Sequence, residues 1–354
     1  MPSTSLNSVR TEIEDSLTFF VKGKAEKLNN IDEYLRPISK SLSEYILAGG
    51  KRFRPVFAYL GFLGAGGAAD PKIARACAAL ELVHVCALIH DDLMDGSDTR
   101  RNRQSIHREF QNYHDEAKYF GSSENYGASV AILLGDLSLV WSDELLFSSG
   151  IATEQLNQAL PIFYDMREEL MAGQYLDVLE SVIGKSSKSR SSKIAQLKSG
   201  KYSIERPLQF GAALSGANPK LLDDFSKFGL ALGEAFQLRD DLLGIFGEPN
   251  VTGKPSGDDI REGKRTLLIA LTLERCNEPE RRLLEKSLGE KTLDNSAIAE
   301  IQELISRCGA KGECERLIAE LFDQSMENLE KSDCIDEIKA LLAEMAMAAT
   351  QREK

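Results

Sequence analysis

The chain has 354 residues, and 43 Lys and Arg residues against 55 Asp and Glu residues give it a formal charge of −12. This acidic balance excludes a generic nucleic-acid-binding protein, whose contact surface is basic. Hydrophobic residues make up 42% and charged residues 28% of the chain, which is the balance of a soluble globular protein. A chain of this length buries about three quarters of its unfolded surface, enough for one large core.

The sequence shows no signal for a membrane or a metal-thiolate site. It has no run of 18 apolar residues, so we expect no membrane-spanning segment. Residues 1–16 lack the apolar stretch of a secretory signal. The six cysteines form no CxxC pair and the four histidines do not follow zinc-ligand spacing. We therefore expect reduced thiols and a cytoplasmic location.

Apolar residues recur at helical spacing along almost the whole chain, which predicts an all-α protein. In chain order the predicted helices cover 7–28, 35–48, 55–63, 71–95, 125–148, 153–181, 191–214, 219–246, 265–275, 294–309, 312–330 and 335–350. Glycine and proline mark the breaks between them. With no credible linker, we expect a single domain over residues 1–354.

Two polar stretches are predicted to be loops. Residues 184–193 (GKSSKSRSSK) are rich in serine and lysine. Residues 247–263 (GEPNVTGKPSGDDIREG) contain four glycines and two prolines and cannot form a regular helix. The second stretch is short and charged, which is typical of a functional loop.

The first candidate site is the acidic segment HDDLMD, residues 90–95, which ends an apolar stretch. On a helix, Asp91 and Asp95 lie one turn apart on the same face. Two like charges at this spacing repel each other, and oxygen ligands without cysteine favour a hard cation, Mg²⁺ or Mn²⁺. A solvated helix end is the alternative interpretation.

A second acidic segment, FQLRDDLLG, residues 236–244, ends another predicted helix about 150 residues later. Gln237 and Asp241 are four residues apart, and Asp240 lies beside them. If the two helices face each other, their carboxylates can hold Mg²⁺ ions around a diphosphate. The smaller segment GQYLD places Gln174 and Asp177 three residues apart, which alone is more typical of a polar patch on a packed helix.

Basic residues accompany glycine breaks or acidic segments at several places, which are Lys51 and Arg54, Arg100 and Arg101, Lys201, Lys254, and Lys264. Each one alone is typical of a surface charge. Together they predict pockets for two polyanions, one bridged by metal and one held by basic side chains alone. His84 lies seven residues before Asp91 on the same helix stripe, where it is either a core histidine or a phosphate donor.

Taken together, these segments resemble the trans-isoprenyl diphosphate synthases, the polyprenyl synthetase family that includes farnesyl and geranylgeranyl diphosphate synthases. The resemblance extends from about residue 40 to 275. It rests on the order and spacing of GGKRFRP, HDDLMDGSDTRR, GQYLD, GKYS, FQLRDDLL and GKPSGDDIREGKRT. It implies the isoprenoid synthase fold, a bundle of long helices around a central cavity, usually in a homodimer.

The resemblance also implies roles for individual residues. The metal ligands would be Asp91, Asp95, Asp240 and Asp177, with Asp92, Asp241 and Lys201 also in the catalytic set. The isopentenyl diphosphate site would consist of Gly50, Lys51, Arg54, His84 and Arg101. The allylic diphosphate site would consist of Arg100, Gln174, Lys201, Tyr202, Gln237, Lys254 and Lys264. Magnesium is the implied cofactor, and manganese could substitute for it.

Two positions depart from the family pattern. Tyr202 stands where the family usually has threonine, so a threonine contact to the allylic diphosphate is in doubt. Gly244 stands where the second acidic motif usually has its last aspartate. The departure at Gly244 suggests a variant metal site, because Asp240, Asp241, Lys254 and Lys264 remain.

The implied reaction is the condensation of isopentenyl diphosphate with an allylic diphosphate (dimethylallyl, geranyl or farnesyl). In this family a large aromatic residue shortly before the first acidic motif stops the chain near C15. Cys86 and Ala87 are small, which predicts geranylgeranyl diphosphate, C20, as the main product. Packed core is the alternative role for these two residues.

Three other functions remain to be distinguished. One is a farnesyl or longer-chain synthase. Another is a terpene cyclase, which needs no second diphosphate pocket. The third is a non-catalytic subunit of a heteromeric prenyl synthase.

Overall fold

The computed structural model describes residues 5–100, 103–183, 187–248 and 256–351. By internal contacts the chain forms two compact units. Unit 1 contains the residues up to Ala159 together with Phe210–Gly216, and unit 2 contains Leu160–Gln209 and the residues from Ala217 onward. The single domain over residues 1–354 stays a prediction.

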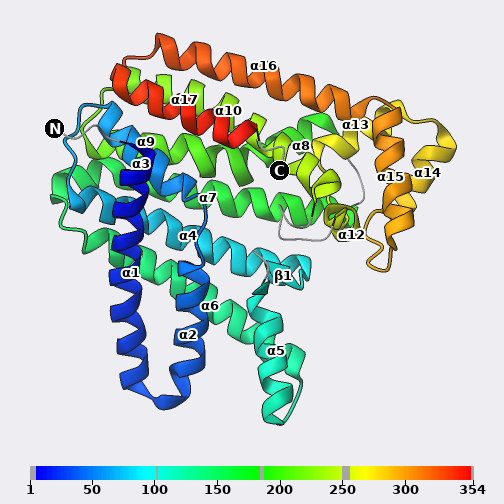
Figure 1. The fold of residues 1–354 in the computed structure, drawn as a ribbon, viewed down its shortest axis with the longest axis horizontal. Helices are drawn as coiled ribbons and strands as arrows, with labels where there is room; N and C mark the ends of the chain where they lie inside the picture. The colour runs from blue at the N-terminus through cyan, green and yellow to red at the C-terminus, as the bar shows by residue number, and fades with distance from the viewer. Residues whose placement is uncertain (1–4, 101–102, 184–186, 249–255, 352–354) are drawn as a thin grey trace. The chain divides into compact units, whose positions relative to one another are not determined.

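Unit 1 consists of helices and one short antiparallel strand pair. Its elements are α1 (Leu6–Ile31), η1 (Glu33–Leu35), α2 (Arg36–Leu47), α3 (Phe53–Gly64), α4 (Pro71–Asp95), β1 (Thr99–Arg100), β2 (Arg103–Gln104), α5 (Ile106–Ala117), α6 (Ser123–Phe147) and the first residues of α7 (Thr153–Ile183). Helices α1 and α2 lie side by side (Figure 1).

Helix α4 is the core helix of unit 1. Asp70 caps its N-terminus by accepting from the backbone N–H of Lys72, and Pro71 occupies the first turn. Gly96 ends it in the left-handed conformation, with φ of +68°. This helix is long and apolar enough to cross a membrane, but 72% of its most apolar window is buried inside the structure, which is typical of a core helix.

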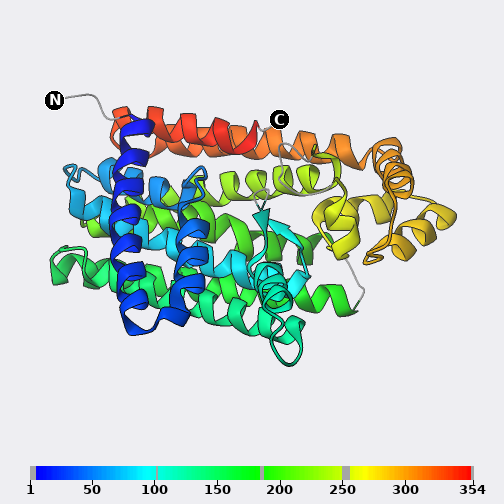
Figure 2. The same ribbon diagram turned by 60° about the horizontal axis from the view of Figure 1, so that its bottom comes forward.

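Helix α6 packs closely along α4 (Figure 2). The hydroxyl of Ser138 donates to the carbonyl of Leu82 at 2.9 Å. The hydroxyl of Ser142 donates to the carbonyl of Ala79 at 2.7 Å. A Cβ added to Gly135 would lie 2.0 Å from Nε2 of His90. Small residues on α6 therefore allow it to approach the segment of α4 that leads to Asp91.

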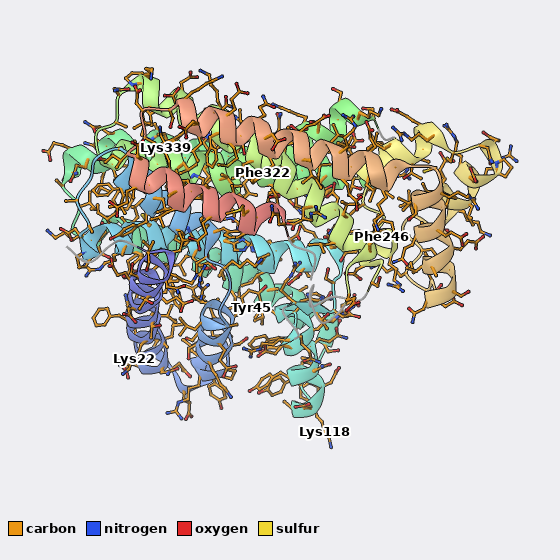
Figure 3. All side chains as sticks on the ribbon, turned by 45° about the horizontal axis from the view of Figure 1, so that its top comes forward. Lys22, Tyr45, Lys118, Phe246, Phe322 and Lys339 are labelled. Carbon is orange, nitrogen blue, oxygen red and sulfur yellow. The ribbon has the colours of Figure 1, made fainter. Side chains whose placement is uncertain are left out.

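Unit 2 is built around one long helix. Its elements are the remainder of α7, α8 (Lys188–Ala195), η2 (Gln196–Glu205), α9 (Arg206–Leu214, up to Gln209), α10 (Pro219–Phe246), α12 (Asp258–Glu262), α13 (Leu267–Arg275), α14 (Glu278–Ser287), α15 (Asn295–Arg307), α16 (Ala310–Lys331) and α17 (Asp336–Thr350). Helices α16 and α17 run along α10 (Figure 1). Phe246 ends α10 (Figure 3) and packs beneath the ammonium group of Lys311.

The all-α prediction is confirmed, and the predicted helices 71–95 and 219–246 match α4 and α10 at both ends. Several parts of the prediction are wrong. Residues 247–263, predicted as a loop that cannot form a regular helix, contain the short helix α12. Helices α5 and α14 were not expected, because their sequences are short and highly polar. The predicted helix 191–214 is divided into α8, a ten-residue π-helix (η2) and α9.

The predicted loop 184–193 is also partly wrong. Residues 188–193 belong to α8. The hydroxyl of Ser187 caps this helix by accepting from the backbone N–H of Arg190. The Arg190 side chain is paired with buried Glu180 on α7 at 2.8 Å. A cap and one ion pair thus order a segment whose composition is typical of a loop.

Candidate active site

The loop before α3 has an unusual backbone. Gly49 and Gly50 have φ of +83° and +136°, and Arg52 has φ of +48°. Glycine adopts positive φ without strain, whereas a non-glycine residue there costs roughly 1 kcal/mol or more. Of the predicted isopentenyl diphosphate ligands, Lys51 is exposed and Arg54 is half-buried.

Arg52, between these ligands, points into the core and is 3% exposed. Its guanidinium donates to Oε1 of Glu81 on α4 at 2.6 Å and to the carbonyl of Ile46 at 2.9 Å. Its Nε lies 3.6 Å from a carboxylate oxygen of Glu14 on α1. One side chain therefore joins the loop to α1, α2 and α4. Predicted ligand His84 is half-buried one turn after Glu81.

The first acidic segment forms the last turn of α4. Asp91 and Asp95 are half-buried, whereas Asp92 is fully buried. Arg100 on β1 donates from Nε to Oδ1 of Asp92 at 2.8 Å, and its terminal nitrogen lies 3.6 Å from Asp91. Tyr45 of α2, labelled in Figure 3, donates to the other oxygen of Asp92 at 3.4 Å.

Arg100 thus holds the acidic segment together. Burial alone would lower the pKa of Arg100, but the charges of Asp92 and Asp91 outweigh it and raise that pKa above its usual value. Asp92 is enclosed by protein donors, which leaves the half-buried carboxylates of Asp91 and Asp95 as the better candidates for a metal.

Cys86 and Ala87 lie one turn before Asp91. The Cys86 side chain is buried, and its Sγ lies 3.8 Å from Nδ1 of His90. Nε2 of His90 in turn lies 3.2 Å from the carbonyl oxygen of Ile132 on α6. Any larger residue at position 86 therefore has to displace an imidazole that also contacts the neighbouring helix.

In unit 2 the predicted ligand Lys201 lies within the π-helix η2. A Cβ on Gly233 would lie 2.3 Å from Cα of Gly200, so η2 and α10 touch backbone to backbone there. Wide turns of this kind are rare and often occur at functional sites. The close contact lies one turn before Gln237 and fixes Lys201 against the helix that carries the second acidic segment.

The half-buried carboxylate of Glu169 pairs with Lys201. Its ammonium group lies 2.5 Å from Oε1 of Glu169 on α7, and Arg206 donates to both oxygens of Glu169 at 2.8 Å. Burial would raise the pKa of Glu169, but the hydrogen bonds from Arg206 and Lys201 overcome it and lower that pKa. Neighbouring Tyr202 is 2% exposed.

The segment around Gln174 and Asp177 also contacts η2. A Cβ on Gly173 would lie 2.7 Å from the backbone nitrogen of Lys198. The Lys198 ammonium donates to Oδ2 of Asp177 at 2.7 Å. Gln174 is half-buried on the same stretch of α7.

The second acidic segment lies near the end of α10. Asp240 is half-buried, whereas Asp241 is 4% exposed and accepts from the side-chain amide of Gln237 at 2.7 Å. Burial, together with the charges of Asp259, Asp240 and Asp177, raises the pKa of Asp241 to about 8. The carboxylates of Asp259, Asp240 and Asp177 are therefore close enough to Asp241 to disfavour its ionisation.

Gly244 lies against the short helix α12, which follows α10 in the chain. A Cβ on this glycine would lie 1.8 Å from Oδ2 of Asp259, which belongs to α12. The other oxygen of Asp259 lies 3.3 Å from the ammonium group of predicted ligand Lys264. Lys264 is also paired with Glu262 at 2.6 Å.

Some predicted ligands cannot be placed, because Arg101 and Lys254 lie outside the described residues. Four residues that contact predicted site residues were not expected from the sequence; they are Tyr45, Glu169, Lys198 and Asp259. Three further unexpected residues act one contact away, because Arg52 pairs with Glu81 and Arg206 pairs with Glu169. Arg52 and Asp259 lie inside the segments that carry the family resemblance. Only their burial and partners reveal what they do.

The acidic segments suit a hard cation that is completed by substrate. Within the described ranges, no group of three or more His, Cys, Asp and Glu side chains is arranged so that it could hold a metal ion by itself. Mg²⁺ commonly uses one or two carboxylates and fills its remaining positions with water and phosphate oxygens. The half-buried oxygen donors Asp91 and Asp95 fit this requirement.

Comparison with known proteins places the chain in a family. The family model described as polyprenyl synthetase matches residues 36–305. The chain belongs to the polyprenyl synthetase family. Members of this family are trans-prenyl diphosphate synthases, and the fold is the all-α isoprenoid synthase fold.

Individual relatives differ in the product that they are named for. A geranylgeranyl diphosphate synthase of Sulfolobus acidocaldarius is 29% identical, over 85% of this chain and 83% of the relative. A (2E,6E)-farnesyl diphosphate synthase of Mycobacterium tuberculosis is 31% identical, over 78% of this chain and 70% of the relative. The crystal structure of a geranylgeranyl pyrophosphate synthase from Corynebacterium glutamicum, complexed with isoprenyl diphosphate and magnesium, has a TM-score of 0.95 and 37% identity, and the match covers 99% of this chain and all of that chain.

Proposed function

We propose that the protein is a magnesium-dependent geranylgeranyl diphosphate synthase. It would join isopentenyl diphosphate to an allylic diphosphate by a 1′-4 condensation. The proposal is carried by one observation: α4 bears a carboxylate pair at its C-terminal end and, at Glu81, anchors the loop that carries Lys51 and Arg54. One helix thus supports both an acidic element for a metal-bound diphosphate and a basic element for a second diphosphate.

Asp91 and Asp95 would hold divalent cations in unit 1, and Asp240 would do so in unit 2. When bound, the cations supply positive charge that stabilises a departing diphosphate. The Corynebacterium relative, crystallised with isoprenyl diphosphate and magnesium, supports this assignment. Manganese is proposed as a substitute, since it also prefers oxygen ligands.

Basic side chains of the protein would bind and orient the two diphosphates. Lys201, Lys264 and Arg100 would bind the allylic diphosphate, whose C1–O bond breaks with the electron pair leaving on the diphosphate. Lys51, Arg54 and His84 would hold isopentenyl diphosphate so that its double bond attacks C1, after which a proton is lost. Rate enhancement would come from proximity and from stabilisation of the leaving group.

The C20 product is proposed because small side chains precede the first acidic segment. Cys86 is buried at that position and leaves no aromatic barrier. A relative named for geranylgeranyl diphosphate and a structural neighbour named for the pyrophosphate both support it. The relative named for farnesyl diphosphate makes C15 the competing product.

A homodimer is proposed because α6 carries an uncovered apolar stripe. Leu133, Val140 and Phe147 recur every seven residues and are 65%, 60% and 54% exposed. Side chains at this spacing lie on one face of a helix. Mass determination by light scattering tests this: Leu133→Glu with Val140→Glu should yield a monomer, and an unchanged mass would place the interface elsewhere.

A cytoplasmic location is also proposed. None of the six cysteines, all within the described residues, forms a disulfide, which suits a reducing compartment.

The deciding experiment measures product length. The purified chain is incubated with labelled isopentenyl diphosphate, Mg²⁺ and dimethylallyl, geranyl or farnesyl diphosphate in turn. Chromatography should show C20 as the main product, and EDTA should abolish it. A product without isopentenyl diphosphate would indicate a terpene cyclase, and no product at all would indicate a non-catalytic subunit.

A further inference from the structure

Arg52 is the one charged residue of the segment GGKRFRP that is buried, whereas Lys51 is exposed and Arg54 is half-buried. Its side chain and that of Glu81 are 1% and 2% exposed, and they form an ion pair at 2.6 Å. Burying two charges is costly and is repaid only when geometry and further hydrogen bonds are good. Here the carbonyl of Ile46 accepts a further hydrogen bond from the same guanidinium.

The backbone at Arg52 is held in a conformation that arginine does not favour. Its φ of +48° follows Gly50, which has a φ of +136°. Such strain persists only where the surroundings fix it. In this conformation residue 52 is buried, Lys51 is exposed and Arg54 is half-buried, and α3 starts at Phe53.

We propose that Arg52 and Glu81 are positioning residues for the isopentenyl diphosphate site. The proposal rests on the proposed function and deepens it. Their buried ion pair joins the loop that carries Lys51 and Arg54 to α4, one turn before His84. The three predicted phosphate ligands are therefore held relative to one another by a contact that does not itself reach the substrate. Misplacing a ligand by about 1 Å can cost about 100-fold in rate.

The test removes the pair without leaving a lone buried charge. Arg52→Met combined with Glu81→Leu replaces the pair by apolar side chains of similar volume, a change that proteins often tolerate. We expect KM for isopentenyl diphosphate to rise at least 10-fold. KM for the allylic diphosphate should stay within two-fold. A purely structural role would lower the melting temperature and the active fraction but leave both KM values unchanged.

The matched control removes another ion pair of unit 1. Lys24 on α1 and Glu144 on α6 are paired away from the predicted ligands. Lys24→Met combined with Glu144→Leu should leave both KM values unchanged. If the control raises KM for isopentenyl diphosphate as much as the test variant does, the proposal is wrong.

Direct binding separates this proposal from the proposed function. Calorimetry with isopentenyl diphosphate alone, without Mg²⁺, should show binding to the wild type and at least 10-fold weaker binding to the Arg52→Met, Glu81→Leu variant. Equal binding to both proteins overturns the positioning role, while the absence of binding to the wild type overturns the proposed function itself.

A single substitution covers the case in which the double variant does not fold. Arg52→Lys keeps a charge opposite Glu81 but loses the fork that also reaches Ile46. We expect KM for isopentenyl diphosphate to rise about three-fold, with the allylic KM unchanged. A KM for isopentenyl diphosphate equal to that of the wild type would contradict the proposal.

Discussion

The side chain of Asp259 on α12 occupies the space in which a Cβ at Gly244 on α10 would lie. A Cβ on the glycine would lie 1.8 Å from Oδ2 of the aspartate and 2.4 Å from its Cγ. The family motif usually has an aspartate at position 244. In this chain the carboxylate nearest to position 244 is instead that of Asp259 on α12, and it lies beside Lys264.

This relationship predicts that Gly244→Ala is harmful. Alanine normally stabilises a helix interior relative to glycine by about 0.5–1 kcal/mol. At this position the added methyl group must displace Asp259, and overpacking typically costs about 1–3 kcal/mol. We expect a lower free energy of unfolding in urea and at least a 10-fold lower kcat/KM for the allylic substrate.

Moving the carboxylate from position 259 to position 244 provides the control. Gly244→Asp alone should be worse than Gly244→Ala, because its side chain is larger and charged. Adding Asp259→Gly removes the clash and should restore part of the stability. If Gly244→Asp alone retains full stability and activity, Asp259 does not occupy the space as described.

The fold was largely predictable because helical periodicity and caps are local signals. Asp70-Pro71 and Asn218-Pro219 each place a cap before a proline, and both helices begin where the sequence indicates. The missed helix α14 starts with a capping box formed by Asn277 and Glu280. That signal was present in the sequence but lacked an apolar stripe to support it.

The candidate site was predictable only where residue type reveals chemistry. Acidic pairs and glycine-flanked lysines are recognisable by spacing. Supporting residues such as half-buried Glu169 and buried Glu81 are not recognisable, because a glutamate in a helix has the same sequence signature whether it faces water or an arginine. The π-helix was also beyond prediction, since it depends on the contact between Gly200 and Gly233, which are distant in sequence.

Removing the half-buried carboxylates at the end of α4 should abolish turnover while preserving the fold. Asp91→Ala or Asp95→Ala removes a proposed metal ligand, and we expect kcat to fall at least 100-fold. Asp98→Ala is the matched control: this exposed aspartate is paired only with Arg108 in the described contacts and should leave kcat unchanged. Near wild-type turnover in Asp91→Ala would refute the metal assignment.

A large residue at position 86 should shorten the product. Cys86→Phe places an aromatic ring one turn before Asp91 on a buried face of α4. We expect chromatography to show C15 in place of C20, with total turnover reduced because the ring must also displace His90. An unchanged C20 distribution would show that Cys86 belongs to the packed core and not to the wall of the product tunnel.

The buried carboxylate of Glu205 should make stability depend on pH. Glu205 is 3% exposed in η2, and burial raises its pKa even though Ser226 donates a hydrogen bond to it at 2.5 Å. A carboxyl whose pKa is raised by folding contributes stability that is complete below its unfolded pKa. This contribution is lost as pH rises through the folded pKa, because the folded state then has to accommodate the charge.

Glu205→Gln tests this because the amide has the same shape and no charge. The variant should be more stable than the wild type at pH 8, and the difference should shrink as the pH falls towards 4, where the wild-type carboxyl is protonated in both states. Urea unfolding midpoints at pH 4, 6 and 8 measure it. If the variant is less stable than the wild type at pH 8, then hydrogen bonds to the ionised carboxylate outweigh its burial and the direction assigned to this pKa is wrong.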